Sequence, residues 1–128
     1  MLALLSRRLD FGDAPFLERP INPLLQVLAY GAGFVAQGTP ADMGGLAKLI
    51  EEAIRHPGFS FVNVQSPCVT YGEASQQLKA HKAEMKTLAS VGHDPADLMQ
   101  AMALSREYGT RLYTGVFYRH GEPAPKGR

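Results

Sequence analysis

The sequence contains very little cysteine, no excess of charge of either sign and no long apolar run. A single cysteine in 128 residues excludes an internal disulfide framework and suits a reducing cytoplasm. The 13 basic and 12 acidic residues leave a net charge of +1, which is not the electrostatic footprint of a protein that binds nucleic acid or an anionic membrane. No apolar run approaches the roughly 20 residues that span a bilayer. We therefore expect a cytoplasmic protein with no nucleic-acid partner and no membrane partner.

The chain begins with MLALLSRRL, in which the arginines follow the apolar stretch. A signal peptide has the opposite order and ends at a small-residue cleavage site, so we expect none here. The length and the hydrophobic content of 45% predict one globular domain over residues 1–128. We expect an irregular N-terminal segment (1–20), an α/β body (21–119) and a flexible tail (120–128) that is rich in proline, glycine and charge.

Capping residues followed by proline predict where helices begin, because Asn, Thr and Asp accept hydrogen bonds from the first turn and proline is tolerated there. Such pairs occur at 22–23, 39–40 and 94–95. The expected elements are helices over 23–29, 40–55, 73–90 and 95–108 and strands over 34–36, 59–64 and 112–118. The side chains expected to face the core are Met43, Leu46, Ile50, Ala53 and Ile54 in the second helix, Ala74, Leu78, His81, Met85 and Leu88 in the third, and Leu98, Met99 and Met102 in the fourth.

This order of elements predicts an α/β fold with a small, mostly parallel sheet flanked by helices. A sheet of three strands would leave its edges exposed unless another segment or another chain covers them. The first helix carries Leu24, Leu25, Val27 and Leu28 and has almost no polar face. We therefore predict that the chain self-associates or requires a partner.

The stretch FSFVNVQSPCVTYG, residues 59–72, contains the only cysteine of the chain, Cys68. Its apolar run predicts a buried, central strand, and ligand crevices in α/β sheets lie at the carboxyl ends of strands. We therefore expect Cys68 at the carboxyl end of the middle strand, near the rim of the sheet. From chemistry alone, a small buried side chain and a nucleophile with His81 or His93 as its base both remain open.

Other common site motifs are missing. The sequence has no Walker motif, HExxH or GxSxG, and no CxxC or spaced Cys/His set that would complete a zinc site. The carboxylates lie on helix faces that we expect to be solvated, and none pairs with another in a way that suits acid–base catalysis. Chemistry in this chain therefore depends on Cys68.

Residues 21–73 and 93–123 resemble the β subunit of thiamine-dependent 2-oxoacid:ferredoxin oxidoreductases, and specifically its C-terminal part. The most specific segments are GAGFVA, followed by a helix and a strand, and then SPCVTY. The two-subunit, 2-oxoglutarate-type branch is the most similar. The resemblance implies the fold of the C-terminal half of a thiamine-diphosphate-binding domain.

In that family the β subunit binds thiamine diphosphate and Mg²⁺ and holds a four-iron, four-sulfur cluster. The resemblance implies that Cys68 matches the fourth cluster cysteine, which lies in a P-C-V-T motif. The family's three other cysteines, its Gly-Asp-Gly-Asp stretch and its substrate-contacting lysine have no counterpart here. No catalytic or thiamine-binding residue is therefore carried over. We expect the isolated chain to bind neither thiamine diphosphate nor a stable cluster.

The resemblance implies a fragment or truncated form of a β subunit. The whole enzyme would oxidatively decarboxylate a 2-oxoacid, with 2-oxoglutarate as the expected substrate, to acyl-coenzyme A and pass the electrons to ferredoxin. Its partners would be the α subunit, the missing N-terminal half and ferredoxin. Two alternatives stay open, namely a non-catalytic α/β interaction module derived from that subunit and a Cys-dependent enzyme.

Overall fold

A computed structural model describes residues 10–11, 14–15 and 21–121. Most of the predicted irregular N-terminal segment and most of the predicted flexible tail (residues 122–128) lie outside the described residues. Within the N-terminal segment, β1 (Asp10–Phe11) pairs antiparallel with β2 (Ala14–Pro15).

The body of the chain is a mixed sheet with helices on both faces. Its elements are α2 (Pro23–Ala29), β3 (Phe34–Gly38), η1 (Pro40–Asp42), α3 (Met43–Arg55), β4 (Ser60–Val64), η2 (Val69–Tyr71), α4 (Ala74–Glu84), β5 (Lys86–Thr87), η3 (Leu88–Val91), α5 (Leu98–Ser105) and β6 (Tyr113–Arg119). The strand order is β4-β3-β6-β5. Two of the pairings, β3 with β4 and β5 with β6, are parallel, and β3 with β6 is antiparallel. The predicted α/β class with a small, mostly parallel sheet is confirmed.

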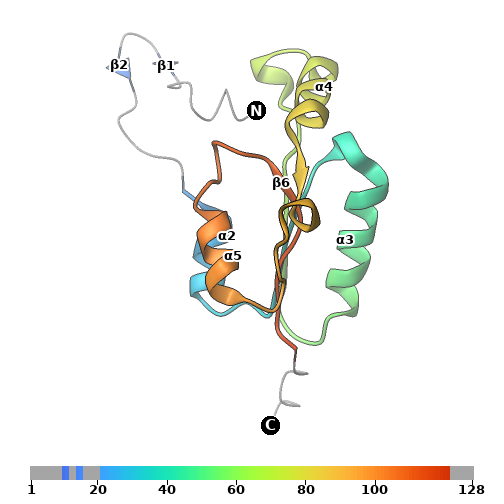
Figure 1. Cartoon of the computed structure of the whole chain (residues 1–128). Coiled ribbons are helices and arrows are strands. Elements are labelled where there is room, and N and C mark those ends of the chain that lie inside the picture. Colours follow the sequence, from blue (N-terminus) through green and yellow to red (C-terminus); the bar gives the residue numbers. More distant parts are fainter. Residues whose placement is uncertain (1–9, 12–13, 16–20, 122–128) are drawn as a thin grey trace.

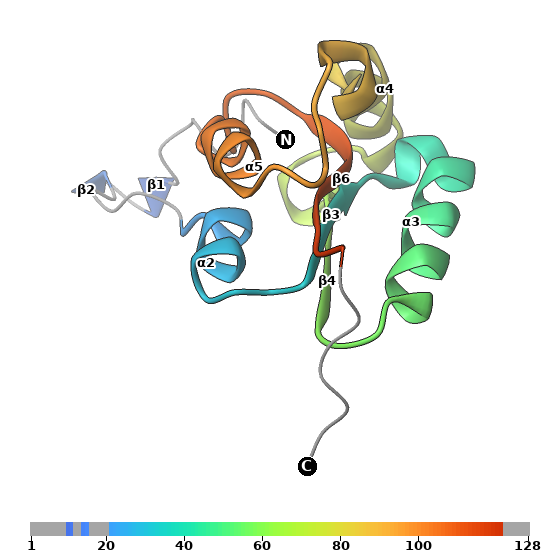
Figure 2. The same cartoon turned by 60° about the horizontal axis from the view of Figure 1, so that its bottom comes forward.

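Helices form one layer on each side of this sheet (Figures 1 and 2). α2 and α5 lie together on one face, and α3 lies alone on the other. The contiguous apolar core lies between the sheet and the α2/α5 layer. Its buried members are Leu24, Leu28, Ala32, Val35, Leu88, Ala101, Tyr113 and Phe117.

The helix starts are largely those that the capping pairs predict. The Asn22 side chain accepts a hydrogen bond from the Leu25 N–H at 3.1 Å, directly before Pro23. Thr39 caps η1, and the Asp42 carboxylate then caps α3 by accepting from the Gly45 N–H at 3.0 Å. These side chains satisfy N–H groups that have no partner within the helix.

The predicted helix over 95–108 is shorter in the structure. α5 begins at Leu98, because Asp97 supplies the cap by accepting from the Gln100 N–H at 3.1 Å. Asp94 instead accepts from the Ala96 N–H at 3.0 Å and so forms a turn ahead of the helix. Met99, one of the residues predicted to face the core, is 73% exposed.

The prediction that 59–64 forms the buried, central strand is wrong. Every residue of β3 is buried, and β3 lies between β4 and β6, whereas β4 is an edge strand whose side chains are half-buried or exposed. Phe59, just before β4, is 63% exposed. An apolar run shows that a segment favours a strand, but the position in the sheet depends on pairings far apart in the sequence.

The prediction of one helix over 73–90 is also wrong in its second half. α4 ends at Glu84, and the Lys86 N–H then donates to the Leu112 carbonyl at 2.9 Å. Lys86 and Thr87 form β5, which pairs with β6 and adds the fourth strand to the predicted three. Leu88 is buried as expected, but from η3.

The expectation that the first helix leaves leucines in water is wrong. Leu24 and Leu28 are 1% and 2% exposed because α2 packs against α5. Exposed apolar side chains occur instead on α3, among other places, where Met43, Ile50 and Ile54 are predicted to face the core and face solvent. Only Leu46 of that predicted inner face is fully buried.

None of the helices in the described part of the chain combines the length and the hydrophobicity needed to cross a bilayer.

Candidate functional site

The carboxyl ends of β3 and β4 lie next to each other because the two strands are parallel. Cys68 follows the end of β4, in the loop that enters η2, and its side chain is half-buried. Cys68 therefore lies past the carboxyl end of the strand, as predicted, but that strand is the edge strand and not the middle one. Gly72, with φ of 143°, ends the loop in a backbone conformation that glycine adopts far more readily than other residues.

Gln77 of α4 fixes the backbone of Cys68 with two hydrogen bonds. The Cys68 N–H donates to Gln77 Oε1 at 2.9 Å, and Gln77 Nε2 donates to the Cys68 carbonyl at 2.8 Å. Gln77 is 8% exposed, so water competes little for these bonds. Gln77 could not be singled out from the sequence, because a glutamine on a polar helix carries no signal that distinguishes it from the residues of the solvated face.

A buried amide network lies beside this loop. Gln37, which is 2% exposed, donates from Nε2 to the Tyr113 carbonyl at 2.8 Å. Its Oε1 accepts from Asn63 Nδ2 at 2.6 Å and from Gln65 Nε2 at 3.4 Å. The network ties β4, β3 and β6 together near the rim, and it explains how a polar residue is accommodated in the most buried strand.

His81 lies one helical turn after Gln77 and is 1% exposed. Its Nδ1 is 3.2 Å from the Thr39 hydroxyl oxygen, which links α4 to the end of β3. Burial lowers the pKa of His81 below its ordinary value of 6.5, because the charged imidazolium loses its hydration. Within the part of the chain that the structure describes, Nε2 of His81 has no hydrogen-bond partner.

His93, the other candidate base for Cys68, is engaged elsewhere. Its Nε2 is 2.6 Å from the Phe117 carbonyl oxygen and its Nδ1 is 3.0 Å from Gln100 Oε1. It therefore joins the turn before α5 to β6. Among the described residues, neither His81 nor His93 forms a hydrogen bond with the Cys68 thiol. The structure thus provides no Cys–His pair of the kind that activates a nucleophile.

A groove of about 440 Å³ runs between α3 and the segment from η3 to β6. Its floor is the part of the sheet that α3 does not cover, and most of its wall is apolar. Charged side chains line its rim from the α3 side. The lining residues include Leu46, Lys48, Leu49, Glu52, Leu88 and Val116. No sequence pattern indicated this groove, because it depends on where α3 crosses the sheet.

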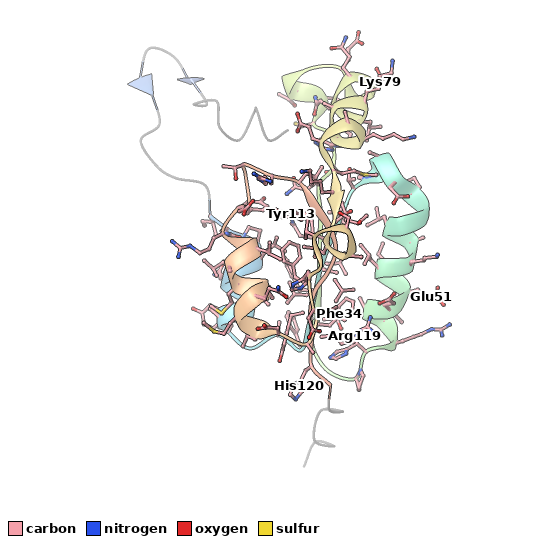
Figure 3. All side chains as sticks on the ribbon, in the orientation of Figure 1. Phe34, Glu51, Lys79, Tyr113, Arg119 and His120 are labelled. Atoms are coloured by element: carbon pink, nitrogen blue, oxygen red, sulfur yellow. The ribbon has the colours of Figure 1, made fainter. Side chains whose placement is uncertain are left out.

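Arg119 lies at the end of β6, on the α3 face of the sheet and at the end that is far from α4. Its guanidinium lies over the ring of Phe34, with 5.5 Å from Cζ to the ring centroid, and pairs with Glu52 of α3. Figure 3 shows Phe34, Arg119 and His120 gathered at this end of the sheet, away from α4 and Lys79. These contacts hold α3 to the sheet.

A four-iron, four-sulfur cluster is usually held by four thiolates. Cys68 is the only cysteine of the sequence, and no three His, Cys, Asp or Glu side chains among the described residues are grouped so that they could hold a metal ion. These residues therefore do not fit a complete cluster. Cys68 fits only as one ligand of a cluster that is otherwise held from outside the described residues, and that role stays a prediction.

Comparison with known proteins shows the class of protein to which this chain is related. Residues 68–126, which begin at Cys68, match the family described as the C-terminal region of the pyruvate ferredoxin oxidoreductase beta chain. The chain is homologous to the β subunit of 2-oxoacid:ferredoxin oxidoreductases, and the resemblance predicted from the sequence is confirmed.

Three individual proteins illustrate the relationship. The chain is 29% identical over 115 residues to the 2-oxoacid:ferredoxin oxidoreductase subunit beta of Saccharolobus solfataricus, covering 83% of this chain and 38% of that protein. It is 35% identical over 80 residues to the 2-oxoglutarate synthase subunit KorB of Methanothermobacter marburgensis, covering 60% and 28%. A solved 2-oxoglutarate:ferredoxin oxidoreductase from Magnetococcus marinus superposes with a TM-score of 0.72 at 35% identity, covering 85% and 37%. The matched residues thus span only 28% to 38% of the length of these relatives.

Proposed function

We propose that this chain serves as the C-terminal part of the β subunit of a 2-oxoacid:ferredoxin oxidoreductase of the 2-oxoglutarate type. The observation that carries the proposal is the likeness to the Magnetococcus marinus enzyme, which extends over 85% of this chain at 35% identity. That enzyme was solved with 2-oxoglutarate, coenzyme A and succinyl-CoA bound. We infer the same substrate class for the assembly in which this chain works, in the cytoplasm.

In this proposal Cys68 supplies one thiolate to a four-iron, four-sulfur cluster. The remaining thiolates, the thiamine diphosphate and the Mg²⁺ are held by the part of the β subunit that the chain does not match, and the enzyme also requires an α subunit. Two features support this role. Gln77 holds the backbone of Cys68 from both sides, and within the described residues the thiol itself forms no hydrogen bond. A ligand with a fixed backbone and a free sulfur suits a rigid cluster.

The test is to co-produce this chain with residues of the Magnetococcus marinus β subunit that lie outside the matched region, together with that enzyme's α subunit. We expect a complex that contains iron and sulfide and reduces ferredoxin when 2-oxoglutarate and coenzyme A are added. Cys68→Ser should lower the iron content and the ferredoxin reduction. Val69→Ser, at the neighbouring and 79% exposed position, is the matched control and should keep both. Equal iron content in Cys68→Ser and in the unaltered chain would contradict the role of Cys68.

The second candidate is a non-catalytic α/β interaction module derived from the same subunit. It is favoured by the finding that the described residues group no three metal-ligating side chains and yet form a contiguous apolar core on one face of the sheet. In the same co-production experiment this module would enter the complex without iron bound through Cys68 and without restoring ferredoxin reduction.

A further inference from the structure

The helix α4 has only polar side chains among its fully buried residues. These are Gln77 and His81, which are 8% and 1% exposed. They lie four residues apart and therefore on the same side of the helix. Lys79, between them in the sequence, lies nearly opposite both, and Figure 3 shows it on the outer side of α4. The most deeply buried contacts of this helix are therefore hydrogen bonds and not apolar packing.

The two buried side chains contact different segments of the chain. Gln77 bonds to the backbone N–H and carbonyl of Cys68 in the loop over residues 65–68, which we call the rim loop. His81 lies against Thr39, which directly follows β3 and caps η1. The most extensive packing of α4 is also against η1. The helix thus connects the rim loop to the end of the most buried strand.

The hydrogen bond between Thr39 and His81 has a defined direction. The Thr39 hydroxyl oxygen accepts from the Ala41 N–H at 3.3 Å and lies 3.2 Å from His81 Nδ1. Thr39 is 1% exposed, so its own hydroxyl proton is buried and requires an acceptor. If Nδ1 carried the ring proton, this hydroxyl would have no acceptor among the described residues. The Thr39 O–H therefore donates to Nδ1, and the neutral ring carries its proton on Nε2.

The protonation state of His81 agrees with this direction. Burial lowers the pKa of His81, whereas Glu84 of the same helix and the backbone of Gln65 act in the opposite direction. The net shift is downward, so the neutral ring is favoured. Only a neutral ring has a nitrogen that can accept the Thr39 hydroxyl proton.

We propose that Thr39 and His81 are positioning residues for Cys68, on which they act through α4 and Gln77. Thr39 fixes His81 at the end of β3, and His81 fixes the helix. Gln77, one turn earlier, then reaches both backbone groups of Cys68. The consequence for a bound cluster rests on the proposed function, whereas the placement of the Cys68 backbone is a property of the chain itself.

The stiffness of the helix allows this action at a distance. Gln77 and His81 are about 6 Å apart along α4 at 1.5 Å per residue, and the residues between them include no glycine or proline. The Gln77 amide is one planar group that makes both bonds to Cys68, at 2.9 and 2.8 Å. A small rotation or shift of α4 therefore weakens both bonds together.

The ends of α4 do not provide an equivalent anchor. Glu73, directly before the helix, makes no capping hydrogen bond with its side chain. The pairing of Lys86 with β6 fixes the chain only after the helix has ended at Glu84. The position of α4 over the rim loop therefore depends on contacts within the helix, of which the bond between His81 and Thr39 is the most deeply buried.

Hydrogen exchange of the Cys68 amide in the full chain tests the proposal, because this N–H donates to Gln77. Thr39→Val keeps the shape of the side chain and removes the hydroxyl, and His81→Leu removes Nδ1 and leaves the cap of η1 in place. Each should accelerate exchange by about three- to tenfold, the effect of losing one hydrogen bond. Thr39→Ser, which retains the hydroxyl, should exchange as slowly as the unaltered chain.

A matched control separates this effect from a general loss of stability. Asp97→Ala removes the cap of α5, which lies apart from α4, and should leave the exchange of the Cys68 amide unchanged. Circular dichroism establishes that each variant is folded. Equal acceleration in Asp97→Ala would overturn the proposal, and so would unchanged exchange in both Thr39→Val and His81→Leu.

The ring of His81 provides a readout in the unaltered chain. Proton–nitrogen NMR at neutral pH should show Nδ1 without a proton and Nε2 with one. A proton on Nδ1 would contradict the direction of the Thr39 bond and overturn the proposal.

Iron content in the co-produced complex distinguishes this inference from the proposed function. His81→Leu and Thr39→Val should lower the iron content, and Thr39→Ser should retain it. If Cys68→Ser loses iron while His81→Leu and Thr39→Val keep it, the proposed function stands and the positioning role at the cluster is overturned. If Cys68→Ser keeps its iron, the proposed role of Cys68 fails, and hydrogen exchange decides the positioning of the rim loop by itself.

Discussion

On one face of the sheet, α2 and α5 enclose a contiguous core, whereas on the other face α3 leaves an apolar stripe and a groove of about 440 Å³ uncovered. Leucines 24 and 28 on the first face are almost fully buried, and isoleucines 50 and 54 on the second are not. Both helices carry large aliphatic side chains, so the presence of such side chains does not explain the difference. The first face has two helices that cover each other, and the second has one. Among the described residues, the packing on one face of the sheet is thus complete, whereas the other face is only partly covered.

The largest effect should come from removing a side chain on the completed face. Leu28→Ala leaves a cavity in the core and should lower the free energy of unfolding by about 2–5 kcal/mol. Ile50→Ala, on the open face, should change it by no more than about 0.5 kcal/mol at concentrations where the chain is monomeric. Urea denaturation of both variants measures the contrast. Equal losses would mean that the two faces are equally complete.

Next in size is the loss of the Gln77 contacts. Gln77→Ala leaves the backbone N–H and carbonyl of Cys68 without their partners, and it should destabilise the chain by about 1–3 kcal/mol. The loop should also open more often, so alkylation of the Cys68 thiol should become faster. Gln76→Ala is the control, because Gln76 is exposed and its side chain contacts only Glu73. Unchanged alkylation in Gln77→Ala would show that the loop is held by other contacts.

Removal of a helix cap should lower the free energy of unfolding by a similar amount on the two faces of the sheet. Asp42→Ala removes the cap of α3 on the open face, and Asp97→Ala removes the cap of α5 on the completed face. Each should cost about 1 kcal/mol, because a cap acts within its own helix. Thermal unfolding of the two variants side by side checks this. A much larger loss in one of them would indicate that its helix start has a further tertiary role.

The smallest effect that we expect depends on pH. Burial keeps the pKa of His81 in the folded chain below 6.5, so at a pH between the folded-state and unfolded-state pKa values the unfolded chain binds the proton more readily. The free energy of unfolding should therefore decrease as the pH falls below about 6.5, and this decrease should end below the folded-state pKa. His81→Gln should flatten the profile, whereas Gln76→Ala, at an exposed position and without loss of a titratable group, should leave it unchanged. A steeper profile in His81→Gln would contradict the sign of the shift.

Local signals in the sequence predict much of the fold. Asn22 and Thr39 mark the starts of α2 and η1 as predicted, because a cap depends on residues within one turn. The strand after Gly33 is recognisable only as far as Ala36, because Gln37 and Gly38 do not look like core residues. Gln37 is nevertheless buried, since its amide bonds to Tyr113 and Asn63, both distant in the sequence.

The remaining errors have the same cause. Met85 and Leu88 continue a helical spacing, but pairing of Lys86 with β6 ends the helix, and periodicity cannot detect a partner 27 residues later. In the candidate site, too, local features could be predicted and contacts between distant segments could not. The place of Cys68 after a strand could be predicted, whereas its support by Gln77 depends on how α4 folds back over the loop.

That support has a consequence for the residue that it holds. Gln77 contacts the backbone of Cys68 and leaves the sulfur alone, so the shape of the loop is encoded nine residues away and does not depend on which side chain stands at position 68. The backbone conformation of the loop is therefore set separately from the side chain at position 68. A serine, a selenocysteine or a labelled side chain at this position should leave the path of the backbone unchanged, so that the chemistry of the side chain can be altered while the loop keeps its shape.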